Sequence, residues 1–299
     1  MNMKKRKKTI SGQIFDFCNI VVLTLFTLVC FYPFYYVFIY SLSDPKQAAL
    51  GVYFLPRGFT LSNFTTIFRL SGLAQAAFVS VARTVIGSFL TVFCSALFGY
   101  VLTKDKLPFK TVIYRFSIIT MYMGAGLIPW YLTIKMYGLS NTFLLYVIPS
   151  AVGMFNVILI KTFIEQLPAS LEESAKIDGA GYLTCFVRII IPLSVPIIAT
   201  IFVFSAVGQW NSYFDNYIFV TNENLRTLQY ILFSYMRKAE IVSRDINAMK
   251  EAMAQRRSNI TPMSVRMSIT MVITLPILFV YPFAQRYFVK GILIGAIKG

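Results

Sequence analysis

The sequence predicts an all-α integral membrane protein with six transmembrane helices, and three observations support that prediction. Hydrophobic residues make up 57% of the 299-residue chain. Charged residues make up only 13%, about half the share expected of a soluble domain. The apolar residues gather in six stretches of about 20 residues or more, which is the length a helix needs to cross a bilayer. Because backbone polar groups in lipid must be paired within their own segment, we expect each stretch to be helical.

The six expected helices follow one another along the chain. They cover about residues 17–42, 76–103, 112–136, 142–164, 190–214 and 265–289. The first stretch spans about 25 residues and is followed by Tyr-Ser-Leu-Ser-Asp, with no clear Ala-x-Ala cleavage site. We therefore interpret it as a retained helix and not as a signal peptide.

Lysine and arginine in the short flanking segments predict the orientation in the membrane. Basic residues cluster in the N-terminal segment 1–16, follow the second helix, recur in the loop 165–189 and end the chain. Such residues remain on the cytoplasmic side, so both termini and the 165–189 loop are expected in the cytoplasm of a bacterial cell. The segment 215–262 is then an extracellular loop, although it is basic, because long loops translocate largely regardless of charge. Within it, the charges from Arg237 to Arg257 alternate with Ala, Ile and Met, which indicates a surface amphipathic helix.

The residue inventory argues against several classes of function. The chain has no histidine, which removes histidine bases and histidine metal ligands, and the cysteine spacing matches no metal site. Paired carboxylates for an enzyme and acidic residues for a proton relay are missing from the apolar stretches. The net charge of +16 comes from residues at the ends of apolar runs, so it indicates orientation and not nucleic-acid binding. We expect a chain that is not an enzyme and that holds no metal or cofactor.

The most informative segment lies between the fourth and fifth helices. Ser170 and Glu173 have the spacing of a capping box, so a short helix is expected to begin there. Glu172 and Lys176 are four residues apart and should pair, and Gly179 occupies the position of a left-handed helix end. A helix of about two turns is marginal in water, so it should dock on a partner. From these features alone, a plain amphipathic connector remains an equal alternative.

The spacing within this loop resembles the signature of binding-protein-dependent ABC permeases. The family pattern is Glu-Ala-Ala, three residues, Gly, nine residues, Ile, one residue and Leu-Pro. The present chain reads Glu173-Ser174-Ala175, three residues, Gly179, nine residues, Ile189, one residue and Ile191-Pro192. Only Ser174 and Ile191 depart from the pattern, and both are conservative replacements.

Three further runs narrow the resemblance to the second permease of maltose-type carbohydrate importers, in particular those paired with lipoprotein-type binding proteins in Gram-positive bacteria. The runs are Ile177-Asp178-Gly179-Ala180, Gly126-Leu127-Ile128-Pro129, and the ending from Tyr281-Pro282-Phe283 to Phe288-Val289-Lys290-Gly291. The similarity covers nearly the whole chain except residues 237–260. It implies the type I ABC importer permease fold and a transmembrane subunit that forms half of the pathway for an oligosaccharide.

The resemblance also implies partners and a coupling helix. The partners are a second, homologous permease, two ATPase subunits that bind ATP and Mg²⁺, and an extracellular lipid-anchored solute-binding protein that delivers the oligosaccharide. This chain has no phosphate-binding loop of its own. The residues expected to couple it to the ATPases are Leu171, Glu172, Glu173, Ala175, Asp178, Gly179 and Ala180.

Sugar-binding side chains are expected where aromatic faces and polar groups occur together inside the bundle. The candidates are Gln209, Trp210, Asn211 and Tyr213 at the end of the fifth helix, with Asn156, Trp130 and Tyr131 as further residues. Interfacial anchoring is the alternative for Trp and Tyr, and the partner permease is the alternative place for the binding contacts. Arg83 is interpreted as reaching the lipid headgroups, with no assigned role.

Other transport classes remain open at this point. An ABC permease for amino acids or peptides has the same signature loop, so the sugar assignment depends on the resemblance. A membrane carrier outside the ABC class is the remaining, weaker alternative.

Overall fold

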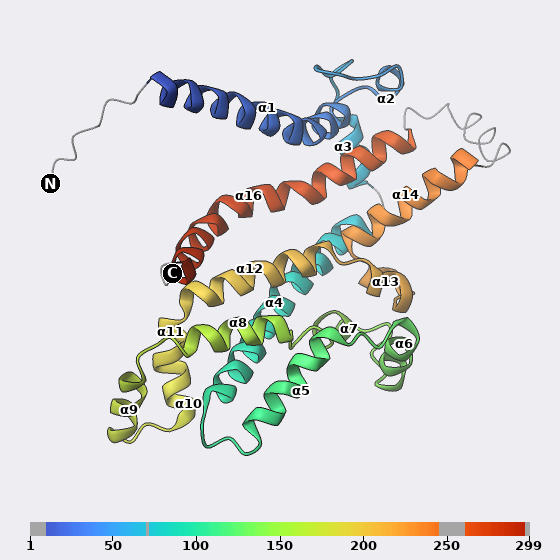
Figure 1. Ribbon diagram of the computed structural model, residues 1–299. Coiled ribbons are helices and arrows are strands. Elements are labelled where there is room, and N and C mark those ends of the chain that lie inside the picture. Colours follow the sequence, from blue (N-terminus) through green and yellow to red (C-terminus); the bar gives the residue numbers. More distant parts are fainter. Residues whose placement is uncertain (1–9, 70–71, 245–260, 297–299) are drawn as a thin grey trace. The chain divides into compact units, whose positions relative to one another are not determined.

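The computed structural model describes residues 10–69, 72–244 and 261–296, and these residues contain helices and no β-strand (Figure 1). They fall into two compact units. The first comprises the described residues within Met1–Arg69 and Lys238–Val272, and the second those within Leu70–Arg237 and Ile273–Gly299. Two helices, α14 (Leu228–Arg244) and α16 (Pro262–Ala296), have residues in both units.

The first unit contains one long apolar helix and a short helical loop. The helices are α1 (Ile10–Ser41), α2 (Pro45–Ala48), α3 (Ser62–Phe68) and the start of α16. Only the end of α1 is buried, where Ile39 and Tyr40 form a small core with Ala48, Val52 and Met267. The rest of α1 exposes apolar side chains, as expected for a helix surrounded by lipid.

The second unit is built around α4 (Leu73–Thr103), along which α8 (Met154–Ile164) and α12 (Val195–Asn211) pack (Figure 1). Its other helices are α5 (Lys110–Tyr122), α6 (Leu127–Met136), α7 (Leu144–Val147), α9 (Ala169–Ile177), α10 (Tyr182–Cys185), α11 (Ile191–Leu193) and α13 (Phe214–Phe219), with one π turn, Phe186–Ile190, and one 3₁₀ turn, Glu223–Leu225. Gly99 allows the close crossing of α4 and α8, because a Cβ there would lie 3.1 Å from the carbonyl oxygen of Val157.

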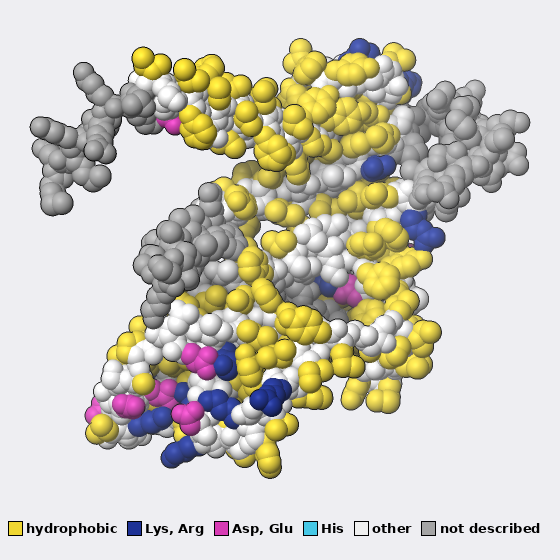
Figure 2. Space-filling model, viewed as in Figure 1, with side chains coloured by type: hydrophobic (Ala, Val, Ile, Leu, Met, Phe, Trp, Pro, Cys, Tyr) yellow, Lys and Arg dark blue, Asp and Glu magenta, His cyan; other side chains and the backbone are white. Residues whose placement is uncertain are grey.

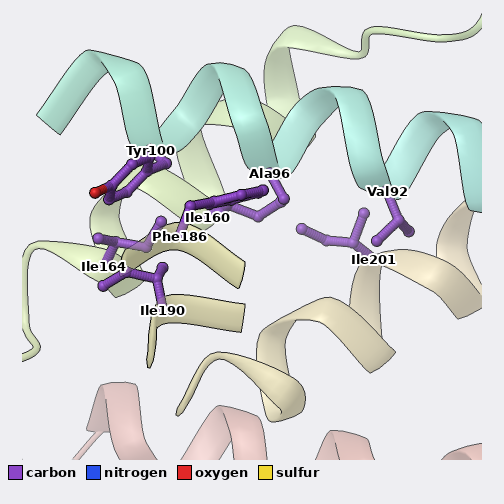
Figure 3. Close-up of a cluster of buried hydrophobic side chains, with 8 residues drawn as sticks. All are labelled: Val92, Ala96, Tyr100, Ile160, Ile164, Phe186, Ile190 and Ile201. Carbon is purple, nitrogen blue, oxygen red and sulfur yellow. The ribbon is translucent and has the colours of Figure 1, made fainter. Parts of the chain in front are cut away.

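A hydrophobic core of this unit lies where α4 packs against α8, which precedes α9, and against the π turn and α12, which follow it. Eight buried side chains form one cluster: Val92, Ala96, Tyr100, Ile160, Ile164, Phe186, Ile190 and Ile201. Figure 3 shows that they come from α4, α8, the π turn and α12. Apolar side chains that close together exclude water and fix the relative positions of these elements.

Three of the expected helices differ from the observed ones. By length and composition, three described helices can cross a membrane: Ile10–Ser41, Leu73–Thr103 and Met263–Pro282. Two further pairs of helices are long and apolar enough only when each pair is taken together, and each pair is bent. Lys110–Tyr122 and Leu127–Met136 are bent by 115°, and Tyr182–Leu193 and Val195–Asn211 by 82°. The stretch 142–164 contains the four-residue α7 and the 11-residue α8 instead of one helix.

Glycine and proline explain these breaks. Gly126 has a φ of 81°, a left-handed conformation that L residues rarely adopt, and it stands between α5 and α6. Pro149 and Gly153 separate α7 from α8. Pro196 has no N–H to continue the helical ladder, and the bend between α11 and α12 lies beside it.

The segment 215–262 is largely helical where it is described, with α13, the 3₁₀ turn and α14. Of the amphipathic helix expected from Arg237 to Arg257, residues 245–257 lie outside the described residues. Figure 2 shows acidic and basic side chains gathered at the α9 end of the second unit, while hydrophobic side chains cover most of the visible surface of α1.

Candidate coupling helix and translocation cavity

The nine-residue α9 begins directly after Pro168, which is its N-cap. Ser170 is therefore inside the first turn, and its hydroxyl caps nothing; its carbonyl accepts a hydrogen bond of 2.8 Å from the hydroxyl of Ser174. The expected capping box is wrong for this reason. Pro168 takes the N-cap position, two residues before the serine.

The end of α9 agrees with the expectation. Gly179 has a φ of 82°, and its N–H donates to the carbonyl of Lys176 at 3.0 Å. The N–H of Ala180 donates to the carbonyl of Ala175 at 2.9 Å, which completes the double hydrogen bond of a Schellman motif. The chain thereby reverses sharply after Asp178, and the predicted left-handed cap is confirmed.

The outer face of α9 is uncovered by the described residues. No residue of α9 is buried, Ile177 is 87% exposed, and Leu171, Glu173 and Asp178 are exposed as well. Leu183, just beyond the turn, is 68% exposed. A short polar helix that ends in exposed apolar side chains has the composition of a docking surface.

The inner face of α9 is held by Glu172. Its carboxylate accepts a hydrogen bond of 3.1 Å from the hydroxyl of Tyr100 and forms ion pairs with Lys104 and, at 3.0 Å, with Lys176. Burial disfavours the charged carboxylate, but the hydrogen bonds and charges of the two lysines outweigh it and hold the pKa of Glu172 below its usual value. The predicted Glu172–Lys176 pair is confirmed, whereas Tyr100 and Lys104 were not expected. These groups border a groove of about 360 Å³ between α9 and the end of α4.

A second cavity, of about 450 Å³, opens beside the other half of α4. Three of the expected pathway residues line it: Trp130, Asn156 and Gln209. Trp130 stacks on Phe214 with ring centroids 6.3 Å apart and an interplanar angle of 10°. The cavity thus combines an aromatic face with amide groups, which is the combination that sugar hydroxyls and sugar rings require.

Arg83 organises the wall of this cavity and does not reach outward to headgroups. Its guanidinium binds both carboxylate oxygens of Asp215, at 3.0 and 2.5 Å, and donates from Nε to Gln209 at 2.8 Å. It also lies 4.6 Å from the ring centroid of Tyr146. Gln209 in turn donates to the hydroxyl of Ser150 at 2.6 Å. The interpretation of Arg83 as a snorkelling residue is therefore wrong, because a carboxylate 132 positions away neutralises it within the protein.

Four expected pathway residues point elsewhere. The indole of Trp210 donates to the carbonyl of Ile273 at 3.2 Å, and the amide of Asn211 bonds to Val207 and Gln229. Tyr213 stacks on Phe233 and Tyr131 on Phe219, with centroids 4.6 and 5.4 Å apart. Consecutive residues of a helix point about 100° apart, and here Gln209 faces the cavity while Trp210 faces Ile273.

Arg83, Asp215, Tyr146 and Ser150 are the cavity residues that sequence reasoning missed. One signal was available for the first of them, since a charge inside an apolar stretch faces the protein interior in most membrane proteins. For the others the sequence has no comparable signal, because their roles depend on long-range contacts.

Bent apolar helices beside a cavity that holds a few polar groups, with a short exposed helix at one end, are typical of a membrane transport subunit. Residues 3–294 match the family described as binding-protein-dependent transport system inner membrane component, and the chain belongs to that family. It is a multi-pass membrane permease with the type I ABC importer fold and is not an enzyme, because the ATPase is a separate subunit. A permease of this family works with a partner permease, an ATPase and a solute-binding protein.

Individual relatives agree over nearly the full length. Protein LplC of Bacillus subtilis is 34% identical over 292 residues, which are 97% of each chain. The polygalacturonan/rhamnogalacturonan transport system permease protein YtcP of Bacillus subtilis is 34% identical over 96% of this chain and 99% of that one. A crystal structure of a bacterial ABC transporter involved in the import of the acidic polysaccharide alginate contains a similar chain, with a TM-score of 0.85, 28% identity, and coverage of 95% and 100%.

Proposed function

We propose that this chain forms half of the translocation pathway for an oligosaccharide and that α9 is the coupling helix that docks on an ATPase subunit. The observation that carries the proposal is α9 itself: a short helix with a signature spacing, no buried residue, and a sharp Gly179 turn at its end. An isolated helix of this length is marginal, so a partner is needed to cover its exposed face. ATP and Mg²⁺ would bind to the partner ATPases.

The outer surface of the loop supplies the proposed coupling contacts. Leu171, Glu173 and Asp178 are exposed, Gly179 and Ala180 form the turn, and Ala175 lies half-buried between them. Glu172 faces the permease instead. We therefore assign docking to the exposed residues and a separate role to Glu172.

The substrate class is proposed from the cavity and the relatives together. Trp130, Asn156 and Gln209 present an aromatic face and amide groups around about 450 Å³. The names of the YtcP relative and of the alginate transporter both refer to polysaccharides that contain acidic sugars. An oligosaccharide fits both observations better than an amino acid or a peptide, which stays the alternative.

The orientation completes the proposal. Docking of α9 on an ATPase requires residues 165–189 in the cytoplasm, which agrees with the distribution of lysine and arginine and places both termini on the same side. A lipid-anchored binding protein would then deliver the sugar from outside.

Ile177→Cys in a cysteine-free protein tests this orientation. It should react with an impermeant maleimide only after the cells are opened, and labelling of intact cells would refute the orientation.

Gly179→Asp tests the coupling role in the complete importer. The change introduces a side chain at a φ of 82° and a negative charge on the docking face, so uptake of tritiated oligogalacturonides and co-purification of the ATPases should fall about tenfold or more. Gly138→Asp is the matched control, because Gly138 has a φ of 65°, also with no atom within 4 Å of an added Cβ, and lies after α6. Normal uptake and normal co-purification in Gly179→Asp would refute the docking role.

A further inference from the structure

Two neighbouring glutamates of α9 have different surroundings. The side chain of Glu172 is only 15% exposed, whereas Glu173 is exposed and has no ion pair among the described residues. Successive helical residues point about 100° apart, so the two carboxylates point in different directions, and that of Glu173 lies toward the exposed side of the loop. Glu173 is available to a partner subunit, and Glu172 is already bound within the permease.

The groups that bind Glu172 come mainly from the end of α4. Tyr100 is a residue of α4, and Lys104 follows its last turn. The ammonium of Lys104 also lies 3.8 Å from the ring centroid of Tyr100, so carboxylate, ammonium and phenol form one compact group. Hydrogen bonds to an ionised carboxylate are among the stronger contacts that a side chain can make.

Tyr100 is itself fixed in the core. It is 2% exposed, and its ring centroid lies 5.2 Å from that of Phe186, beyond the turn that ends α9. Figure 3 shows Tyr100 beside Phe186 and Ile164, with its hydroxyl oxygen at the edge of the cluster. Tyr100 therefore connects the hydrophobic core to the polar group around Glu172.

The same helix, α4, carries Arg83 in the cavity wall. Arg83 and Tyr100 are about 26 Å apart along the axis, at 1.5 Å a residue. Between them α4 packs on both α8 and α12, so this stretch is held as one rigid element. A displacement of α9 that reaches α4 would therefore reach the cavity.

We infer that Glu172 ties α9 to α4 and thereby transmits movement of the docked helix to the cavity around Arg83, while Glu173 serves the ATPase contact. This inference rests on the proposed function of α9. Glu172 is a positioning residue, since its contacts are with Tyr100, Lys104 and Lys176 of the permease itself. Without it, the inner face of α9 loses its bonds to Tyr100 and Lys104 at the end of α4.

The test measures docking and transmission separately in the assembled importer. In a cysteine-free chain, Asn156→Cys reports on the cavity through its rate of reaction with an impermeant maleimide, with and without a non-hydrolysable ATP analogue. Co-purification of the ATPases with the tagged chain reports docking. Glu172→Gln is compared with Lys106→Gln, which removes the charge of an exposed lysine of the same groove that has no ion pair among the described residues.

We expect the nucleotide analogue to change the labelling rate in the parent chain and in Lys106→Gln, and this change to shrink about tenfold in Glu172→Gln with co-purification intact. A labelling change in Glu172→Gln equal to that of the parent overturns the inference. Loss of co-purification in Glu172→Gln also overturns it, because Glu172 would then belong to the docking face. If the parent chain binds no ATPase or shows no nucleotide response, the proposed function itself fails.

Lys104→Gln tests the same link from its other side, and it should also shrink the labelling change with co-purification intact. Combined with Glu172→Gln in a double-mutant cycle, it should add little to the single effects, because both changes break one interaction. Additive effects of the two changes would show that the residues act separately and would overturn the inference.

Discussion

The two halves of helix α4 carry the same chemistry in different surroundings. Near one end, Arg83 pairs with Asp215 over the ring of Tyr146; at the other, Lys104 pairs with Glu172 over the ring of Tyr100. The Arg83 and Asp215 side chains are 4% and 13% exposed, and those of Lys104 and Glu172 are 16% and 15% exposed.

The two ion pairs differ in how well the helix that carries each carboxylate is packed. Asp215 is the second residue of α13, a packed helix in which Asn216 and Phe219 are buried. Glu172 belongs to α9, which has no buried residue. The Arg83–Asp215 pair joins two packed helices and therefore stabilises the wall of the cavity. The Lys104–Glu172 pair joins packed α4 to exposed α9, so it can transmit a displacement of α9 to α4.

The strongest test of this comparison is Arg83→Met. It leaves Asp215 and Gln209 without their cation, and removing one partner of a buried pair costs about 3–5 kcal/mol. Denaturant unfolding of the purified chain in detergent should show this loss. Arg83→Met combined with Asp215→Asn should recover a good part of it, because no buried charge then remains unpaired. Equal stability of the single and double variants would contradict the proposed role of the pair as a fixed wall.

A smaller effect is expected from Gly87→Ala on the face of α4 that meets Gln209. The added Cβ would lie 2.7 Å from Nε2 of Gln209, so this side chain must move and lose its bond to Ser150. We expect about 1–3 kcal/mol of destabilisation in the same unfolding measurement. Gly208→Ala on α12 is the control, since nothing lies within 4 Å of its added Cβ. Equal stability of the two variants would show that Gln209 is free to rearrange.

The smallest effect concerns pH at the α9 end. The pKa of Glu172 lies below its ordinary value of 4.5, and burial lowers the pKa of Lys104 from its ordinary value of 10.5. On the acid side, the link between the two residues is therefore lost only as the pH falls through the lowered pKa of Glu172. The ratio of the Asn156→Cys labelling rates with and without the nucleotide analogue should therefore stay constant between about pH 8 and pH 5, although both rates fall as the thiolate is protonated. A decline that begins near neutral pH in the parent chain but not in Glu172→Gln would contradict a Glu172 that stays ionised.

The sequence predicted some elements closely and others poorly, for physical reasons. The stretch 76–103 became α4, Leu73–Thr103, because it contains no proline to interrupt the helix. The stretch 112–136 was predicted as one helix but contains two. Hydropathy is averaged over a window, so it does not reveal a turn at residues 123–126 between two apolar halves. At α9 the glycine cap was predictable from local chemistry, whereas the start of the helix was decided by Pro168.

The candidate sites divide in the same way. Trp130, Asn156 and Gln209 could be suspected from residue type and position, and the cavity contains all three. Trp210 and Asn211 could not be told apart from Gln209, since direction around the helix depends on what the helix packs against. Arg83 was correctly expected within the second helix, but its partners are Asp215 and Gln209 and not lipid headgroups.

By itself, the sequence determined the membrane class, the spacing of the α9 loop and the turn at Gly179, because composition, short-range spacing and backbone preference are local properties. Only the tertiary structure decided that Arg83 meets Asp215 and that Glu172 meets Tyr100 and Lys104. These partners lie far apart in the chain, and a charged side chain selects its counter-charge only after packing has brought the two together and removed the water between them.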